Sequence, residues 1–453
     1  MNVLIFGAGR RGLRIAKFLI EENKSVTFLD SSVERCQAAQ AKLDCMAICG
    51  SAVNIEKLIE AGAEEADIVI AVTDSDEVNI VSCGLVAANF PNVKNTIAAI
   101  RSITYTGGSG LPSSPILGIT HIVNPEQEGA LRIADIIRSG LYQDTITFPD
   151  TDFVLFTFEV SKESGYGNRT LIDVRQNSKY NFVVAGINRR GKIITPSGDT
   201  VLRQGDMLAL ISDNEDIHHI LGRSLNIQKY KTPDSIVIVG ATNITRYLLQ
   251  TFTPQERRKV KLIEKDMAIA NEYAILFPDI LVLNEAITDE QIWDEEEIGK
   301  ADLFISLTEN DELNIIASSF AKRAGTKKSI ALLKTNTNYS QFALSLDVDV
   351  ALSITDVTVD SLVKNLRGGG VSALYTLFNG GIECYEYVVQ DNFKYINKAL
   401  KEVNLRNKII IAGVRKSDGT SLVPTGDYVF TKNDSLILAV SHENSNYIQE
   451  LIS

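Results

Sequence analysis

The sequence predicts an α/β protein with two Rossmann-like lobes, each a doubly wound parallel sheet followed by a small, mostly β lobe of α+β type. Short apolar runs alternate with amphipathic helical stretches, which is typical of parallel sheets covered on both faces. A glycine-rich turn joins the first predicted strand to the first helix. Both kinds of segment occur twice, so the predicted order is A-B-A′-B′ over residues 1–141, 142–228, 232–370 and 371–453.

The duplication is visible in two kinds of segment. In the A lobes, Val3–Gly9 returns as Ile236–Thr242 and Thr73–Ile80 returns as Thr308–Ile315, at offsets of 233 to 235 residues. In the B lobes, Ala185–Arg189 returns as Ala412–Lys416, at an offset of 227. A long period with two different parts predicts a duplicated two-lobe unit and excludes a solenoid.

Lobe A is expected to begin directly with its sheet. The predicted strands are Asn2–Phe6, Ser25–Leu29, Asp67–Val72 and Thr96–Ile100. The predicted helices are Arg11–Glu22, Val33–Leu43 and Asp76–Phe90. Each strand is almost entirely apolar, and the first helix carries a broad apolar stripe, so both faces of the sheet are expected to be buried.

Lobe B has a different pattern. Between Thr145 and Leu210 the apolar runs are short and are broken by turn signals at Arg190-Gly191, Ser197-Gly198 and Gln204-Gly205. We expect a small β module, a terminal helix near Asp216–Leu225 and a linker at Lys229–Pro233.

The turn Gly7-Ala8-Gly9-Arg10-Arg11-Gly12 lies between a strand and a helix, and Asp30 ends the next strand. In this position Gly7 permits the tight turn, Gly9 allows backbone N–H groups to approach a pyrophosphate, and Gly12 allows close packing of helix and strand. The helix N-terminus attracts phosphates. Asp30 is placed to accept hydrogen bonds from ribose hydroxyls and to repel a 2′-phosphate. A glycine turn that binds nothing is the competing interpretation.

Two further features of lobe A lie where open α/β sheets bind ligands. Thr73 and Asp74 follow one strand, and Arg101 ends the next, within reach of a phosphate or exposed to solvent. Either Arg10 or Arg11 could contact phosphates, or both could be solvated.

The second copy departs from this pattern. Thr242 and Thr245 replace the second and third glycines after Gly240, while Glu264 keeps the acidic position. A Cβ at Thr242 would crowd a pyrophosphate, so we expect a weak or empty pocket in lobe A′.

Composition narrows the function. The net charge of −12 disfavours binding to nucleic acid or to anionic lipid, because both need a basic surface. No apolar run approaches the length of a membrane-spanning helix, and we expect an intracellular chain. Five cysteines and four histidines predict neither a disulfide framework nor a metal centre.

A dehydrogenase would need a general acid or base beside the nicotinamide. The histidines His121, His218, His219 and His442 do not lie in suitable contexts, and the Tyr-x-x-x-Lys match at Tyr428 and Lys432 falls in a turn-and-strand segment. The nucleotide is therefore expected to act as a signal. An NAD-dependent oxidoreductase and a free-standing nucleotide sensor remain the alternatives.

The lobe order, the GAGRRG turn, Thr73–Asn79 and the lobe B segment from Gly186 to Leu208 together resemble the TrkA family. These are tandem RCK proteins (KTN plus TrkA-C), cytosolic regulatory subunits of Trk potassium uptake systems. The resemblance covers essentially the whole chain. It implies a homotetrameric ring, peripheral on the inner face of the cell membrane, that gates ion flux through a TrkH/TrkG-type membrane subunit.

The resemblance also implies that NAD(H), ATP or ADP binds in lobe A as a regulatory ligand, with no catalytic or metal-binding residues. The implied contacts are Gly7, Ala8, Gly9, Arg10, Arg11, Gly12, Asp30, Thr73, Asp74 and Arg101. Ligands that bind two ring shapes unequally would shift the population between them. The sequence leaves open which nucleotide activates, whether the Gly240–Glu264 pocket binds anything, and whether the C-lobes bind cyclic di-AMP.

Overall fold

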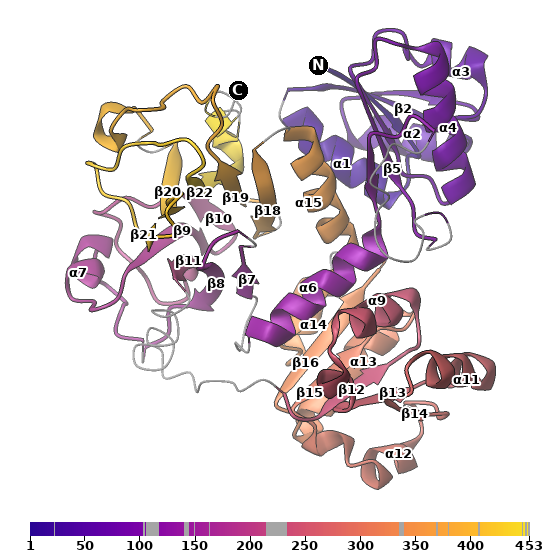
Figure 1. Cartoon of the computed structure of the whole chain (residues 1–453). Helices are drawn as coiled ribbons and strands as arrows, with labels where there is room; N and C mark the ends of the chain where they lie inside the picture. The colour runs from indigo at the N-terminus through magenta and orange to yellow at the C-terminus, as the bar shows by residue number, and fades with distance from the viewer. Residues whose placement is uncertain are drawn as a thin grey trace.

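The computed structural model has the four lobes in the predicted chain order (Figure 1). It describes residues 1–21, 23–102, 105, 117–139, 145–148, 150–162, 164–213, 233–334, 339–367, 370–378, 380–405, 408–445, 447, 448 and 451. The expected helix at 216–225 lies outside these residues, as does most of the expected linker, of which only Pro233 is described.

Lobe A contains a six-stranded parallel sheet in the order β3-β2-β1-β4-β5-β6, which confirms the doubly wound prediction. Its strands are β1 (Asn2–Phe6), β2 (Ser25–Asp30), β3 (Met46–Cys49), β4 (Ile68–Ala71), β5 (Asn95–Ala99) and β6 (His121–Val123). Its helices are α1 (Arg10–Glu21), α2 (Val33–Lys42), α3 (Ile55–Glu60), α4 (Asp76–Asn89) and α6 (Pro125–Ser139). The predicted strands and helices end within a residue or two of the observed ones.

Lobe A′ repeats this topology in the order β14-β13-β12-β15-β16-β17. Its strands are β12 (Ile236–Val239), β13 (Val260–Ile263), β14 (Leu281–Leu283), β15 (Leu303–Ser306), β16 (Lys328–Leu333) and β17 (Val350–Ser353). Its helices are α9 (Asn243–Thr251), α10 (Pro254–Arg257), α11 (Met267–Leu276), α12 (Glu290–Glu295), the 3₁₀ turn η2 (Ile298–Lys300), α13 (Asp311–Ala324), α14 (Tyr339–Ser345) and α15 (Ile354–Arg367).

The two small lobes are antiparallel five-stranded sheets. Lobe B has the order β10-β9-β11-β8-β7 and lobe B′ has the order β18-β19-β22-β20-β21. The elements of lobe B are β7 (Thr145–Thr147), β8 (Phe153–Glu159), α7 (Leu171–Gln176), β9 (Phe182–Arg189), β10 (Lys192–Ile194) and β11 (Met207–Asp213). Those of lobe B′ are β18 (Val371–Leu377), β19 (Ile382–Val388), η3 (Leu400–Glu402), β20 (Ile409–Arg415), β21 (Ser421–Leu422), β22 (Ser435–Ser441) and η4 (His442–Asn444). The predicted turn at Arg190-Gly191 is confirmed, because both residues have positive φ.

The last helix of each Rossmann lobe packs on the other lobe. Helix α15 lies against lobe A, where Leu362 and Val363 share a buried cluster with Val3 and Ile5 of β1. Helix α6 lies against lobe A′, with Ile133 and Ala134 buried beside the β12 side chains. The two helices contact each other at the centre of the molecule (Figure 1). The A and A′ cores are therefore completed only by exchange of these helices.

The B and B′ sheets pack face to face. Phe153 and Ile211 from lobe B are buried in one cluster with Ile382, Cys384 and Ile437 from lobe B′. Lobes A and A′ thus form one packed unit, and lobes B and B′ form another. Helix α15 precedes β18 in the chain and so links the first unit to the second.

Candidate functional site

The predicted ligand loop lies at the carboxyl ends of β1, β2 and β4 in lobe A. We call residues 7–12 with Asp30, Thr73, Asp74 and Arg101 the glycine-loop site. Gly7 has φ +101°, and a Cβ there would lie 3.1 Å from the backbone nitrogen of Thr73. The first glycine is therefore needed both for its conformation and for its contact with the end of β4.

The other two glycines have different surroundings. A Cβ at Gly12 would lie 2.0 Å from the carbonyl oxygen of Gly7, so this glycine permits the close approach of α1 to its own loop. A Cβ at Gly9 would meet only Nη1 of Arg35 within 4 Å, at 3.9 Å. The backbone of Gly9 thus borders open space, as a loop that binds a pyrophosphate requires.

Asp30 holds the loop in shape. One of its carboxylate oxygens, Oδ2, accepts a hydrogen bond from the Ala8 backbone N–H at 2.7 Å, and Oδ1 accepts one from the Ser32 N–H at 2.8 Å. The side chain is almost completely buried. Each carboxylate oxygen has a second lone pair, so binding to ribose remains compatible with this arrangement and stays a prediction.

Thr73 is positioned by a residue that the sequence analysis did not single out. Its backbone N–H and its hydroxyl both donate to Oδ1 of Asn79, at 3.0 and 2.6 Å. The Asn79 amide in turn donates to the carbonyl oxygen of Ala99, at 2.8 Å. Asn79 therefore fastens the end of β4 to the end of β5, and Thr73 shapes the site from within.

Arg101 and Asp74 meet at the edge of the site. The Arg101 guanidinium donates to the carbonyl oxygen of Asp74, and its Nε lies 3.5 Å from Oδ1 of Asp76. The second Asp76 oxygen accepts the backbone N–H of Arg101, at 3.0 Å. Arg101 is thus held at the end of β5 by Asp74 and Asp76, and its contact with a phosphate stays a prediction.

Arg35, on the first turn of α2, also lies at the site and was not predicted. Its Nη1 lies 3.2 Å from Oδ2 of Asp74 and 4.0 Å from Oδ2 of Asp30. A basic residue soon after the acidic end of β2 is the signal that could have indicated it. Its guanidinium spans the space next to Gly9, where a phosphate would compete with Asp74 for it.

The two adjacent arginines of the loop point differently. Arg10 is exposed, whereas Arg11 is half-buried and its Nη1 has no hydrogen-bond partner among the described residues. Burial, reinforced by the nearby Arg101, lowers the pKa of Arg11, and Asp74, Glu126 and Asp76 oppose that shift. Arg11 is therefore a cation with a free donor close to the loop.

Comparisons with known proteins identify the family of the chain. Family models match the chain as TrkA-N domains over residues 3–125 and 236–354, and as TrkA-C domains over residues 155–222 and 384–453. The chain belongs to the TrkA family.

Curated members of the TrkA family match over nearly the whole length. A Trk system potassium uptake protein TrkA homolog from Archaeoglobus fulgidus is 30% identical, with 100% of both chains covered. The Trk system potassium uptake protein TrkA of Haemophilus influenzae is 28% identical, covering 98% of this chain and 97% of the relative. That of Halomonas elongata is 27% identical, covering 97% and 96%.

Solved structures share the fold at lower identity. The GsuK channel bound to NAD matches with a TM-score of 0.58 and 16% identity, covering all of this chain and 78% of the channel chain. The GsuK RCK domain matches with a TM-score of 0.56 and 16% identity, covering all of this chain and 94% of that one. Within the described part of this TrkA-family chain, no helix is long and apolar enough to cross a membrane.

The second TrkA-N domain keeps the frame of the site but fills its loop. The Ala241 N–H donates to Oε2 of Glu264 at 2.8 Å, as the Ala8 N–H does to Asp30. Thr245 is fully buried, and its hydroxyl donates to the Gly240 carbonyl oxygen at 2.6 Å. The larger side chain at the third glycine position is thus accommodated by a hydrogen bond within the turn.

Two further contacts cover the second loop. The Thr242 hydroxyl donates to the Leu307 carbonyl oxygen at 3.1 Å. The hydroxyl of Tyr273, from α11, donates to the Thr242 carbonyl oxygen at 2.6 Å. Lys334 stands where lobe A has Arg101 and pairs with Glu309. These contacts occupy polar groups at the loop, in line with the prediction of a weak or empty pocket there.

Proposed function

We propose that this chain is the nucleotide-sensing regulatory subunit of a potassium uptake system. The observation that carries the proposal is the glycine-loop site, where the bare backbone of Gly9 faces open space beside Arg11, Arg35 and Arg101. Its full-length relatives are named potassium uptake proteins.

The ligand class follows from the charges of the site. Three guanidinium groups next to a helix N-terminus favour a di- or triphosphate, and the buried carboxylate of Asp30 disfavours an additional 2′-phosphate. NAD(H), ATP and ADP fit these requirements, and the related fold of GsuK has been solved with NAD. Such a ligand would supply binding free energy to the loop and to α1, which begins there.

We propose binding without turnover. The carboxylates of the site are already engaged, since Asp30 accepts two backbone N–H groups and both Asp74 and Asp76 pair with arginines. The Tyr428 hydroxyl donates to Asp434, and Lys432 pairs with Asp391, so this Tyr/Lys match serves the packing of lobe B′. Proton transfer would need a group poised for it.

Assembly with further copies of the chain is the second part of the proposal. The outer face of α13 and α14 exposes four large apolar side chains, Ile316, Phe320, Phe342 and Leu344, each with more than half of its surface accessible. Helix α4 exposes Val81 at the position equivalent to Ile316. Exposed apolar side chains in lobe A′, with one at an equivalent position of lobe A, suit contacts between copies, and we propose a homotetrameric ring.

The exchanged helices provide a route from the ligand to the rest of the ring. Helix α1 starts at the glycine loop, and Nε of its Arg14 lies 3.3 Å from Oδ1 of Asp356 on α15. Helix α15 continues into β18 of lobe B′. A ligand that repositions α1 would thereby bias the A and B pairs between two arrangements. The ring would dock on the inner face of a TrkH/TrkG-type membrane subunit.

The test is potassium flux through the reconstituted membrane partner, with ATP, ADP, NAD⁺ and NADH compared. Gly9→Asp places a negative charge in open space at the loop, so it should preserve the fold and abolish the nucleotide response. Thr242→Asp puts the same charge at the equivalent position of lobe A′ and should leave the response largely intact. Flux that ignores all four nucleotides, or that responds equally in Gly9→Asp, would refute the proposal.

The assembly is tested by light scattering of the purified chain. Phe342→Asp should reduce the molar mass by breaking contacts between copies. Val429→Asp, at a similarly exposed apolar residue of lobe B′, is the control and should leave the mass unchanged. An unaltered mass in Phe342→Asp would exclude this face as the assembly surface.

A further inference from the structure

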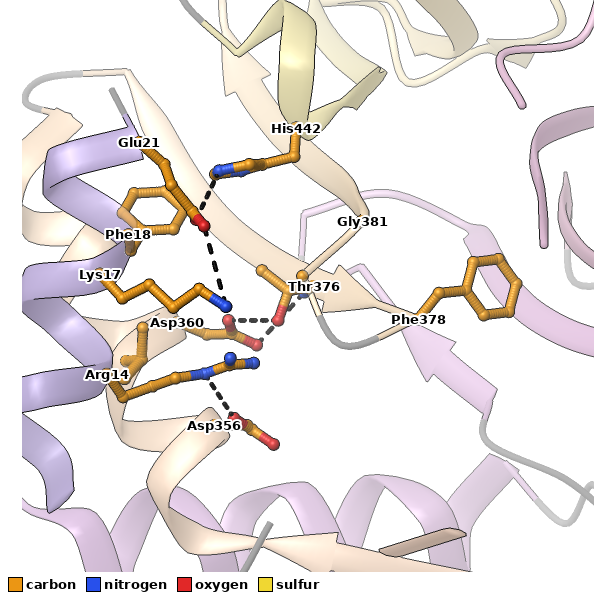
Figure 2. Close-up of a pocket in the computed structure, with 12 residues that line it drawn as sticks. Arg14, Lys17, Phe18, Glu21, Asp356, Asp360, Thr376, Phe378, Gly381 and His442 are labelled. Atoms are coloured by element: carbon orange, nitrogen blue, oxygen red, sulfur yellow. Dashed lines mark hydrogen bonds and ion pairs between the residues drawn. The ribbon is translucent and has the colours of Figure 1, made fainter. Parts of the chain in front are cut away.

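A histidine lies between two carboxylates where lobe A meets lobe B′. Figure 2 shows His442 beside one of them, Glu21. Nδ1 of His442, just after β22, lies 3.0 Å from Oε1 of Glu383 on β19. Nε2 lies 2.8 Å from Oε2 of Glu21 at the end of α1, an ion-pair contact that departs from hydrogen-bond alignment. We call Glu21, Glu383 and His442 the His442 cluster.

The cluster favours the binding of a proton. A neutral imidazole has one N–H and one lone pair, so it would turn the lone pair toward one of the two carboxylates. A protonated ring presents an N–H to each. The Glu383 side chain is fully buried and also accepts a hydrogen bond from the Tyr385 hydroxyl. Little water can therefore relieve the repulsion between an imidazole lone pair and the carboxylate that it faces.

The same junction contains a cavity of about 160 Å³, lined from three elements. Helix α1 contributes Arg14 and Lys17, and α15 contributes Asp356 and Asp360. The turn between β18 and β19 closes the cavity, and the His442 ring lies 5.6 Å from the Phe18 ring. The side chains that join α1 to α15 and to lobe B′ therefore surround one small cavity.

The duplicated chain allows these positions to be compared with those of the equivalent junction. The elements equivalent to α1, α15 and β18 are α9, α6 and β7, and α6 contacts both α9 and β7. The residues at the equivalent positions there are uncharged: Tyr247 for Arg14, Gln250 for Lys17, Gln127 for Asp356, Leu131 for Asp360 and Val154 for Glu383. Charged side chains do occur on α6, where Arg138 donates to the Thr251 carbonyl oxygen of α9, but at these five positions the charges belong to the lobe A and B′ junction alone.

We propose that the His442 cluster is a proton-binding latch that fastens lobe A to lobe B′ when it is protonated and releases it as the pH rises. The latch is inferred from the positions of these side chains. Its action does not require a bound nucleotide. If lobe A also senses nucleotides, the position of α1 would couple the two signals.

Other charged groups lie at the same junction. Lys17 lies 3.8 Å from Glu21, and Arg14 is paired with Asp356. Burial raises the pKa of Asp360 to about 7, despite hydrogen bonds from Thr376 that lower it. Above that pH, Asp360 becomes negative and repels Asp356, which lies one turn away on the same helix.

The direction in which pH acts on the latch follows from these groups. Because a carboxylate lies beside each ring nitrogen, the latch is closed while His442 is protonated and opens when the ring loses its proton as the pH rises. Asp360 is neutral while the latch is closed and charges as it opens.

The first experiment follows the histidine rings of the full chain by NMR with ¹³C-labelled histidine, between pH 5.5 and 9. Only four histidines contribute signals, and His442→Gln assigns the one of interest. Glu21→Gln should move the midpoint of the His442 signal to lower pH. Glu56→Gln removes the same charge from exposed α3 and should not move it. A midpoint that is the same in Glu21→Gln and in the unmodified chain would overturn the proposal.

The second experiment measures hydrogen exchange of α1 and β19 at pH 6.0 and 8.5, corrected for the intrinsic pH dependence. At pH 6.0 the unmodified chain should be more protected than His442→Gln by about tenfold, the factor that corresponds to one unit of pKa. At pH 8.5 the two should converge. Equal protection at both pH values, or a ratio that does not change with pH, would show that no latch exists. Nucleotide-free samples keep this outcome separate from the test of the proposed function.

Discussion

Gly12→Ala is the sharpest test of the close packing behind the glycine loop. The new Cβ would lie 2.0 Å from the Gly7 carbonyl oxygen and 3.3 Å from Cε1 of Phe28. The first of these is backbone, which cannot rotate away as a flexible side chain can. Helix α1 would have to withdraw from the loop by roughly 1 Å to restore ordinary contact.

The expected change in the free energy of unfolding of Gly12→Ala is the balance of two contributions. Overpacking of this kind costs about 2 to 3 kcal/mol, and alanine recovers about 1 kcal/mol of helix propensity relative to glycine. The expected net loss in the free energy of unfolding is therefore about 1 to 2 kcal/mol. For a domain of this size, the unfolding midpoint of lobe A should fall by roughly 2 to 8 °C.

Gly9→Ala is the matched control, because its Cβ would meet nothing closer than Arg35 at 3.9 Å. Thermal unfolding without nucleotide should show a loss for Gly12→Ala and a change within about 0.5 kcal/mol for Gly9→Ala. Calorimetric titration with ATP or NADH should show weaker binding in both variants. An unchanged midpoint in Gly12→Ala, or equal losses in the two variants, would refute the argument from contacts.

Three further predictions concern single side chains. Arg11→Ala should weaken ATP more than NADH in calorimetric titrations, because its buried guanidinium has a free donor near the loop; equal losses would remove Arg11 from phosphate binding. Asp360→Asn should gain stability relative to the unmodified chain as the pH rises from 5 to 8, since a raised carboxyl pKa costs folding free energy between the unfolded value and about 7; a constant difference in melting temperature would contradict this. Arg189→Ala should lower the free energy of unfolding by about 3 kcal/mol in urea titrations, because the buried carboxylate of Asp206 loses two bonds of 2.7 Å; a change below about 1 kcal/mol would show that water replaces them.

The regular elements of lobe A could be predicted because each is specified locally. The strand Asn2–Phe6 was predicted with its observed ends, since it is a continuous apolar run with a glycine turn after it. Strand β3 (Met46–Cys49) was not predicted, because this edge strand is short and only partly buried and so has a weak pattern. Local pattern determines an element well only where both faces are covered.

The positions of the site residues divide in the same way. The roles of Gly7 and Gly12 follow from the backbone of a strand–turn–helix unit and were predictable from spacing. The places of Arg35 and Asn79 depend on contacts across several strands, which spacing does not reveal. The hydrogen bond of Thr245 likewise depends on how the turn relaxes around a larger side chain.

The exchange of α6 and α15 could not be predicted from the sequence. Both helices have apolar stripes, but a stripe does not specify which of two similar sheets will cover it. Only the packing of Val363 beside β1, and of Ile133 beside β12, distinguishes the partners.

Because each half of the chain lends its final helix to the other, neither half carries a complete interior of its own. Cleavage by a protease between residues 213 and 233 would break the chain, but the two fragments would remain associated through the packing of α6 and α15. The first half expressed by itself should pair with a second copy of itself. The surface of lobe A that α15 normally covers would then be covered by helix α6 of the other copy. The tandem chain can thus be regarded as such a self-paired ancestor joined end to end, after which the two glycine loops could diverge in sequence.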